Sequence, residues 1–261
     1  MTANKKLIIG NWKMNFDVHT ASLYLHKLSE MVEVHHDIEV VLAPTLLALQ
    51  SLSLQVNLRQ FKLAAQNFYW RDHGTYTGEV SASQLRGIVQ YALVGHSERR
   101  NIFHETNKDV CNKVQAAVRN NIKPILIIGE TAWERSSGEA FDVINDQLMS
   151  GLANITSDDL SNVIIAYEPV WADGTGNNAL TEDVSVAVKT IRKQIEHLYG
   201  KDASVAIRIL YGGSVTADSA ADYLAISGVD GLLIGNASLH ANMFNEIIKK
   251  AHKGSSVADK D

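Results

Sequence analysis

The feature that most constrains the fold of this chain is a series of eight short apolar runs that recur along its length. Within each run the apolar residues are consecutive and do not alternate with polar ones, which is typical of strands buried on both faces. Dividing the 261 residues by eight gives about 33 per unit, enough for one strand and one helix. The runs occupy residues 6–12, 39–44, 62–67, 91–96, 123–130, 162–169, 206–213 and 230–235.

The segments between the runs predict helices. In residues 18–34, Leu23, Leu28 and Met31 fall near one stripe of a helix, and residues 107–120 show the same kind of spacing. Both segments are therefore expected to pack one apolar face against the strands.

A further helix is expected to begin with Thr181 as its N-cap hydroxyl and to stop at Gly200. Strand and helix in alternation predict a parallel sheet with helices outside it. Eight such units favour an α/β fold, a (β/α)8 barrel forming a single domain over residues 1–261. Its polar tail, from about residue 252 to 261, is expected to fray. An open doubly wound sheet is the alternative, but no GxGxxG follows the first run and no GxxxxGK[ST] occurs.

Composition excludes several classes of protein. The chain has 24 Lys and Arg against 29 Asp and Glu, a net charge of −5, so no basic surface for nucleic acid is expected. No apolar stretch approaches the roughly 20 residues of a membrane helix. One cysteine, Cys111, cannot form an internal disulfide; it lies inside a predicted helix and is expected to fill the protein core. These features predict a cytoplasmic protein without a membrane partner.

Polar and glycine-rich segments follow the strands at their carboxyl ends, which share one face of a barrel. One carboxylate, one imidazole and one ammonium on that face suit the removal of a proton beside a carbonyl, with the enolate oxygen stabilised by the two nitrogen groups. Backbone N–H groups after the last two strands suit an anionic handle such as phosphate. The residues are Asn11, Lys13, His96, Glu168, Ser214, Gly235 and Asn236.

No metal site is expected, because no HxH, HExxH or CxxC occurs. The adjacent His35 and His36 are expected to be solvated, since neighbouring positions of a helix end do not form a ligand pair. Two other functions stay open at this point. One is a Schiff-base aldolase with Lys13 as nucleophile, and the other is a non-catalytic barrel that binds or scaffolds.

Seven segments, in order and spanning almost the whole chain, resemble the triosephosphate isomerase family. They are Asn-Trp-Lys-Met-Asn (11–15), Ala-Gln-Asn (65–67), Tyr-Thr-Gly-Glu-Val-Ser (76–81), Gly-His-Ser-Glu-Arg-Arg (95–100), Ala-Tyr-Glu-Pro-Val-Trp-Ala (166–172), Tyr-Gly-Gly-Ser-Val (211–215) and Gly-Asn-Ala-Ser-Leu (235–239). The resemblance implies interconversion of glyceraldehyde 3-phosphate and dihydroxyacetone phosphate through an enediolate, without a cofactor or metal.

The resemblance also implies roles for individual residues. Glu168 looks like the general base and His96 like the neutral electrophile that polarises the carbonyl. Lys13 would stabilise the phosphate and the developing negative charge. Glu98 would either form an ion pair with Lys13 or transfer a proton. Asn11 would line the pocket, and the backbone N–H donors to the phosphate would be those of Gly174, Ser214, Gly235 and Asn236.

Family members are usually homodimers, in which the loop around Thr77 reaches the rim of the partner's pocket. Residues 169–179 resemble the family's lid over the phosphate. The chain departs from the family pattern at several positions. Asp173 stands where an aliphatic residue is usual, 177–178 is Asn-Asn where a basic residue is followed by Thr or Val, Ile127 stands at a common Cys, and Asn236 at a frequent Gly.

Overall fold

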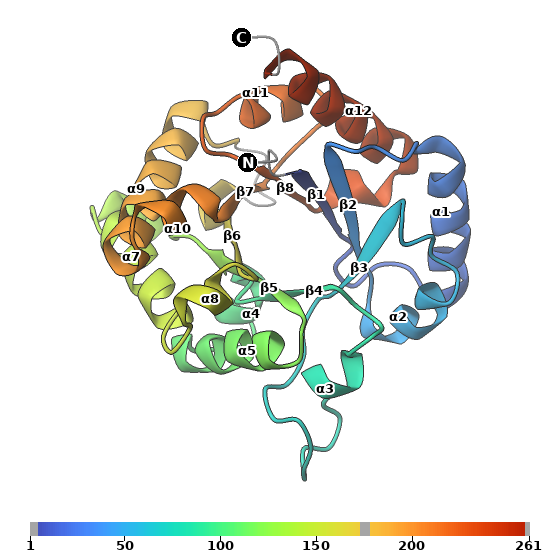
Figure 1. Cartoon of the computed structure of the whole chain (residues 1–261), viewed down its shortest axis with the longest axis horizontal. Helices are drawn as coiled ribbons and strands as arrows, with labels where there is room; N and C mark the ends of the chain where they lie inside the picture. Colours follow the sequence, from blue (N-terminus) through green and yellow to red (C-terminus); the bar gives the residue numbers. More distant parts are fainter. Residues whose placement is uncertain (1–4, 173–177, 259–261) are drawn as a thin grey trace.

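The computed structural model describes residues 5–172 and 178–258, and they form a closed barrel of eight parallel strands surrounded by helices (Figure 1). Each strand pairs with the next in the chain, and β8 pairs with β1. The predicted barrel is thus confirmed, and the open sheet is excluded because it would leave two unpaired edges. The strands are β1 (Lys6–Asn11), β2 (Ile38–Ala43), β3 (Phe61–Ala65), β4 (Tyr91–Val94), β5 (Lys123–Ile128), β6 (Ile164–Tyr167), β7 (Arg208–Gly213) and β8 (Gly231–Ile234).

Helices connect the strands, several of them only a turn or two long. They are α1 (Val18–Met31), α2 (Leu46–Ser53), α3 (Ala82–Leu85), α4 (Ser97–Asn101), α5 (Asn107–Arg119), α6 (Ala132–Ser136), α7 (Ala140–Gly151), α8 (Ser157–Leu160), α9 (Thr181–Tyr199), α10 (Lys201–Ala206), α11 (Ala220–Leu224) and α12 (Ala241–Ala258), with the 3-10 helices η1 (Val170–Ala172) and η2 (Asn236–Leu239).

The continuous apolar runs arise because each strand is buried on both faces. Side chains such as Ile9, Leu93 and Ile127 fill the inside of the barrel, whereas Ile8 and Leu42 pack outward against the helices. The eight runs therefore predicted the strands correctly. The strands lie in parallel, so their carboxyl ends open at one end of the barrel.

Helix α1 presents to the barrel a face that only partly matches the expected one. Leu23 is 56% exposed, while Ala21, Tyr24, Leu25 and Leu28 are buried. The Tyr24 ring lies 4.9 Å from that of Trp12, and its hydroxyl donates to the Ser238 carbonyl at 2.5 Å. Of the expected stripe, Leu28 is buried and Met31 packs against the core, and only Leu23 was wrong, because Tyr24 takes its place on the buried face.

Helix α9 has the expected extent but not the expected cap. Its N-cap is Leu180, which has no side-chain hydrogen bond, and Thr181 is the first helical residue. The Thr181 hydroxyl instead lies 3.1 Å from the carboxylate of Glu182. Gly200 ends the helix with φ of 89°, a conformation that favours glycine.

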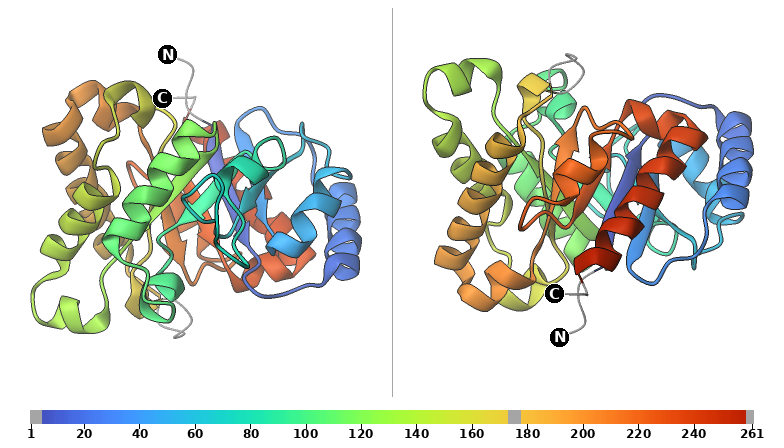
Figure 2. Two further views of the ribbon diagram at one scale, coloured as in Figure 1. Left: turned by 90° about the horizontal axis from the view of Figure 1, so that it is seen from below. Right: turned by 90° about the horizontal axis from the view of Figure 1, so that it is seen from above.

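Helix α12 runs back along the outside of the barrel beside β1, as the right-hand view of Figure 2 shows. It extends to Ala258, across much of the tail for which fraying is predicted. Within the described residues, no helix combines the length and apolarity needed to cross a membrane.

Candidate active site

Glu168 directly follows β6 and is almost completely buried, with 4% exposure. Its backbone N–H donates to the Ile128 carbonyl of β5 at 2.8 Å. The next residue of that neighbouring chain segment is Gly129, where an added Cβ would lie 1.9 Å from the Glu168 carbonyl oxygen. Only glycine allows this approach, so Gly129 fixes where the backbone of Glu168 sits.

Donors from His96 and Ser97 hold the carboxylate of Glu168. Its Oε1 lies 3.1 Å from His96 Nε2, and its Oε2 accepts the Ser97 backbone N–H at 3.2 Å. Both donors come from the segment after β4, so β4 and β6 together bring the predicted imidazole and carboxylate into contact.

His96 is the N-cap of the short helix α4, and this position determines its tautomer. Its Nδ1 accepts the backbone N–H of Glu98 at 3.2 Å. An Nδ1 that accepts a hydrogen bond leaves the proton of a neutral ring on Nε2. The structure therefore directs the Nε2–H of His96 toward Glu168, and toward the space in front of it.

Burial and mutual charge act in opposite directions on this pair. Burial raises the pKa of Glu168, but His96 and the Ser97 N–H outweigh burial and lower that pKa to about 2. Burial lowers the pKa of His96, while the Glu168 carboxylate raises it, and the net shift is upward. Glu168 is accordingly an ionised acceptor at neutral pH.

Lys13 follows β1 in a backbone conformation that non-glycine residues rarely adopt, with φ of 52°. Its N–H donates to Asn11 Oδ1 at 3.1 Å, and its carbonyl accepts from Gln66 Nε2 at 2.8 Å. The Nζ atom lies 2.9 Å from Glu98 Oε1. Of the two arrangements expected for Glu98, the structure contains the ion pair.

These contacts form a continuous row of charged and polar groups. Lys13 meets Glu98, Glu98 lies 3.7 Å from His96 Nδ1, and His96 meets Glu168. Four groups that follow the ends of three strands thus each lie within contact distance of the next.

The residues expected to hold an anion line one pocket of about 460 Å³ beside Lys13. The Lys13 side chain passes Gly235, where an added Cβ would lie 3.5 Å from Lys13 Cε, an ordinary van der Waals distance. The Ser214 hydroxyl donates to the Ala172 carbonyl at 2.9 Å, which joins the end of β7 to η1. Gly174, Asp173 and Asn177 lie outside the described residues. The predicted residues on this pocket are Asn11, Lys13, Ser214, Gly235 and Asn236.

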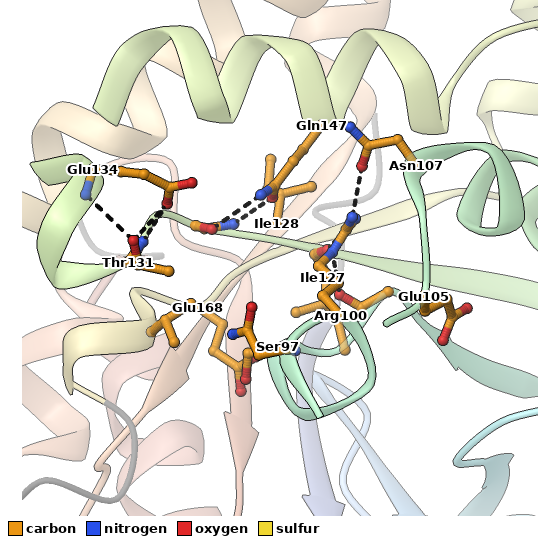
Figure 3. Close-up of a pocket in the computed structure, with 14 residues that line it drawn as sticks. Ser97, Arg100, Glu105, Asn107, Ile127, Ile128, Thr131, Glu134, Gln147 and Glu168 are labelled. Atoms are coloured by element: carbon orange, nitrogen blue, oxygen red, sulfur yellow. Dashed lines mark hydrogen bonds between the residues drawn. The ribbon is translucent and has the colours of Figure 1, made fainter. Parts of the chain in front are cut away.

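A second cavity, of about 250 Å³, lies against Glu168 and is lined by residues of β5 and α4 (Figure 3). Arg100 spans it, donating to the Gly95 carbonyl at 2.7 Å and to Asn107 Oδ1 at 2.6 Å. Gln147 closes another side by exchanging hydrogen bonds with the backbone of Gly129. Arg100 thus stabilises the segment after β4, and Gln147 stabilises the segment after β5; both segments contact Glu168.

Sequence reasoning missed two groups at the site. Ser97 belongs to a quoted segment but was given no role, although its N–H holds the Glu168 carboxylate. Glu130 is fully buried and accepts from Trp171 Nε1 at 2.9 Å and from the Tyr167 hydroxyl at 3.1 Å. Its position as the last residue of the fifth run was the available signal, because strand ends collect functional side chains.

Three other predicted residues lie apart from this row of groups. Thr77 is exposed on the segment between β3 and α3, which extends beyond the ring of helices in Figure 1. Ile127 is buried inside the barrel, as expected for a packing position. Cys111 is only half-buried on α5, where its sulfur accepts from Gln115, so its assignment as core filler was partly wrong.

Comparison with known proteins gives one family. The triosephosphate isomerase family model matches residues 6–251. A triosephosphate isomerase of Alkaliphilus oremlandii (strain OhILAs) is 42% identical over 246 residues, covering 94% of this chain and 98% of that protein. Those of Alkaliphilus metalliredigens (strain QYMF) and Chloroherpeton thalassium (strain ATCC 35110 / GB-78) are 40% and 41% identical, covering 94% and 95% of this chain and 98% and 99% of theirs.

Proposed function

This chain belongs to the triosephosphate isomerase family and is an isomerase of triose phosphates; from this premise we propose which residues carry the reaction. The reaction interconverts glyceraldehyde 3-phosphate and dihydroxyacetone phosphate, a step of glycolysis. It needs a base for a carbon-bound proton, an electrophile for the carbonyl oxygen, and a site for the phosphate. The arrangement of Glu168, His96 and Lys13 supports one residue for each requirement.

Glu168 is the base. Its low pKa keeps it ionised, and burial leaves the carboxylate poorly hydrated, so little water must be removed before it accepts a proton. The Ser97 N–H and His96 stabilise the ionised form and must yield to the substrate. The carboxylate then takes the proton from one carbon of the triose and returns it to the neighbouring carbon.

His96 is the electrophile, and it acts as the neutral ring. The main cause that raises its pKa is the Glu168 carboxylate, and that influence weakens once the carboxylate moves onto the substrate. Burial, the charge of Lys13 and the Glu98 N–H on Nδ1 remain and oppose protonation, against the smaller influence of the Glu98 carboxylate. The Nε2–H therefore stabilises the enediolate oxygen as a hydrogen-bond donor.

Lys13 and the neighbouring backbone hold the phosphate. The ammonium offers a positive charge to an otherwise acidic protein, and the N–H groups of Ser214, Gly235 and Asn236 border the same pocket. Asn11 lines this pocket and holds the Lys13 backbone. Gly174 stays a further predicted donor.

Glu98 is a positioning residue for Lys13 in this proposal. The 2.9 Å ion pair orients the ammonium toward the pocket. A lysine nitrogen held in an ion pair is a poor nucleophile, which disfavours a Schiff-base mechanism.

We further propose a cytoplasmic homodimer that pairs through the Thr77 loop. Two exposed features support the pairing: the projecting segment around Thr77, and Met14, which is 94% exposed beside Lys13. The family's place in glycolysis supports the cytoplasm.

The test is conversion of glyceraldehyde 3-phosphate by the purified protein, with a chelator present and no cofactor added. We expect fast formation of dihydroxyacetone phosphate. Glu168→Gln should lose turnover by orders of magnitude, and Glu168→Asp should also lose most turnover while retaining affinity for a phosphate-bearing enediolate mimic, because proton transfer depends on sub-ångström placement. The exposed Glu139→Gln is the matched control.

Retained turnover in folded Glu168→Gln would remove that residue from the base role. Trapping of substrate on Lys13 by borohydride would instead favour the aldolase reading.

A further inference from the structure

Three potential metal ligands converge at the end of the barrel opposite the active site. His35 and Asp37 belong to the connection between α1 and β2, and His252 lies on α12. One potential ligand atom from each of the three lies within 4.8 Å of the others. The cluster joins segments separated by more than 200 residues, so no local sequence motif could predict it.

The geometry within this cluster is close to what a metal ion needs. His252 Nδ1 lies 3.0 Å from both carboxylate oxygens of Asp37, and the rings of His35 and His252 are 4.4 Å apart between centroids. Tetrahedral zinc with bonds of 2.0–2.1 Å holds its ligand atoms about 3.3 Å apart. Small rotations of half-exposed side chains would bring all three donors to that spacing.

The two segments are also held firmly by the fold. The Asp37 carbonyl accepts the backbone N–H of Lys6 at 2.9 Å, at the point where β1 and β2 begin. Helix α12 packs against α1, β1 and β2. This packing places the side chain of His252 beside the connection between α1 and β2. Ligands on such elements lose little conformational entropy when a metal binds.

We propose that His35, Asp37 and His252 form a binding site for a divalent transition metal, with Zn²⁺ as the ion that the donor set fits. Two imidazoles and one carboxylate are borderline ligands, unsuited to Mg²⁺ or Ca²⁺, which prefer oxygen alone. Exposure of His252 leaves room for water as a fourth ligand. The site lies away from the reaction, and it would clip α12 to the α1–β2 connection.

An ion pair between His252 and Asp37 is the simpler explanation of part of this cluster. It has no need of His35, whereas the metal site needs all three. His36, by contrast, is exposed and takes no part, as the sequence predicted. The behaviour of His35 therefore decides between the two explanations.

The experiment is a Zn²⁺ titration of untagged, metal-stripped protein in competition with a chromophoric zinc indicator. We expect one ion per chain. Loss of an outer-shell partner weakens metal affinity by roughly 10- to 100-fold, so His35→Asn and His252→Asn, which remove ligands, should each weaken it at least tenfold. His26→Asn is the matched control, because His26 lies 3.6 Å from the carboxylate of Glu30 and belongs to no group of three potential ligands among the residues that the structure describes.

A second measurement, hydrogen–deuterium exchange, reports the clip itself. Zn²⁺ should slow exchange in the C-terminal half of α12 in the wild type and not in His35→Asn. Isomerase activity, whose residues lie at the other end of the barrel, verifies that each variant is folded. Unchanged affinity in His35→Asn, or equal affinity in all variants, would overturn the proposal.

Discussion

At the scale of single residues, the site depends on groups held in place before substrate arrives. Lys13 adopts a left-handed backbone at a cost of order 1–3 kcal/mol, and it is held there by its N–H donating to Asn11 and its carbonyl accepting from Gln66. That conformation carries the side chain past Gly235 to Glu98. The ammonium is therefore positioned by local strain and by its ion pair together.

Replacing Lys13 by Ala should nearly abolish substrate binding. The change removes the pocket's ammonium and leaves Glu98 facing the phosphate, so we expect affinity for a phosphate-bearing enediolate mimic to fall roughly 100-fold or more. Calorimetric titration measures this, with the exposed Lys249→Ala as the control. Retained affinity in Lys13→Ala would place the phosphate elsewhere.

The paired ionisations of Glu168 and His96 should appear in the pH dependence of stability. The pKa of Glu168 is 4.5 in the unfolded chain and lower in the folded protein, so its ionisation stabilises the fold at pH values above 4.5. That contribution is lost as the pH falls toward 2. The pKa of His96 is 6.5 in the unfolded chain and higher in the folded protein, so its protonation stabilises the fold at pH values below 6.5. That contribution is lost as the pH rises past the folded-state pKa. The pair contributes most between about 4.5 and 6.5.

Urea unfolding of the wild type and Glu168→Gln across pH 3–8 measures this contribution. The difference in free energy of unfolding should peak inside that window. A difference independent of pH would show that the two groups are not coupled as the structure has them.

At the scale of elements, the sequence predicted the strands well and the helices unevenly. Burial on both faces gives each strand a continuous apolar run, a signal that is independent of its neighbours. The face of α1 depends on where Tyr24 meets Trp12, and a single helix pattern contains no information about that contact. Short helices such as α4 and α6 have too few residues for any periodicity, so they went unpredicted.

The contact between β5 and β6 gives a test at this scale. Gly129→Ala places a methyl group 1.9 Å from the Glu168 carbonyl, so the backbone that carries the base must shift. A displacement of about 1 Å can cost about 100-fold in rate, and we expect a loss of that order in kcat. Steady-state kinetics on folded protein, verified by circular dichroism, measure it.

Gly151→Ala is the matched control for this variant. Its added methyl would overlap the side chain of Leu126, also on β5 and away from Glu168. We expect lower stability with kcat unchanged per folded molecule. Equal kcat losses in the two variants would mean that Gly129 has no special relation to the base.

At the scale of the whole molecule, the site could be predicted because a parallel barrel gathers all its carboxyl strand ends at one face. Asn11, His96 and Glu168 are far apart in sequence, yet topology alone brings them together. What topology does not supply is the contact between individual atoms. The Ser97 N–H on Glu168 and the buried Glu130 beneath Trp171 depend on side-chain packing across several elements.

The proposed dimer gives a prediction at this scale. Thr77→Arg places a bulky charge at the tip of the projecting loop, so we expect the chain to sediment as a monomer with reduced turnover. Sedimentation velocity and kinetics at matched concentrations measure both effects. Val205→Arg, at an exposed position on α10, is the control and should keep the wild-type behaviour. A monomeric wild type would contradict the proposal.

The pairing of β1 with β8 has a consequence for how the chain is made. Lys6 Nζ donates to the Val229 carbonyl across a separation of 223 residues, and β1 gains its second neighbour only from Gly231–Ile234. Contacts so distant in sequence form slowly, because a long loop must close before they stabilise anything. During synthesis one edge of β1 therefore stays unpaired until β8 leaves the ribosome. An unpaired strand edge favours aggregation, so we expect the nascent chain to be most prone to aggregation in this interval.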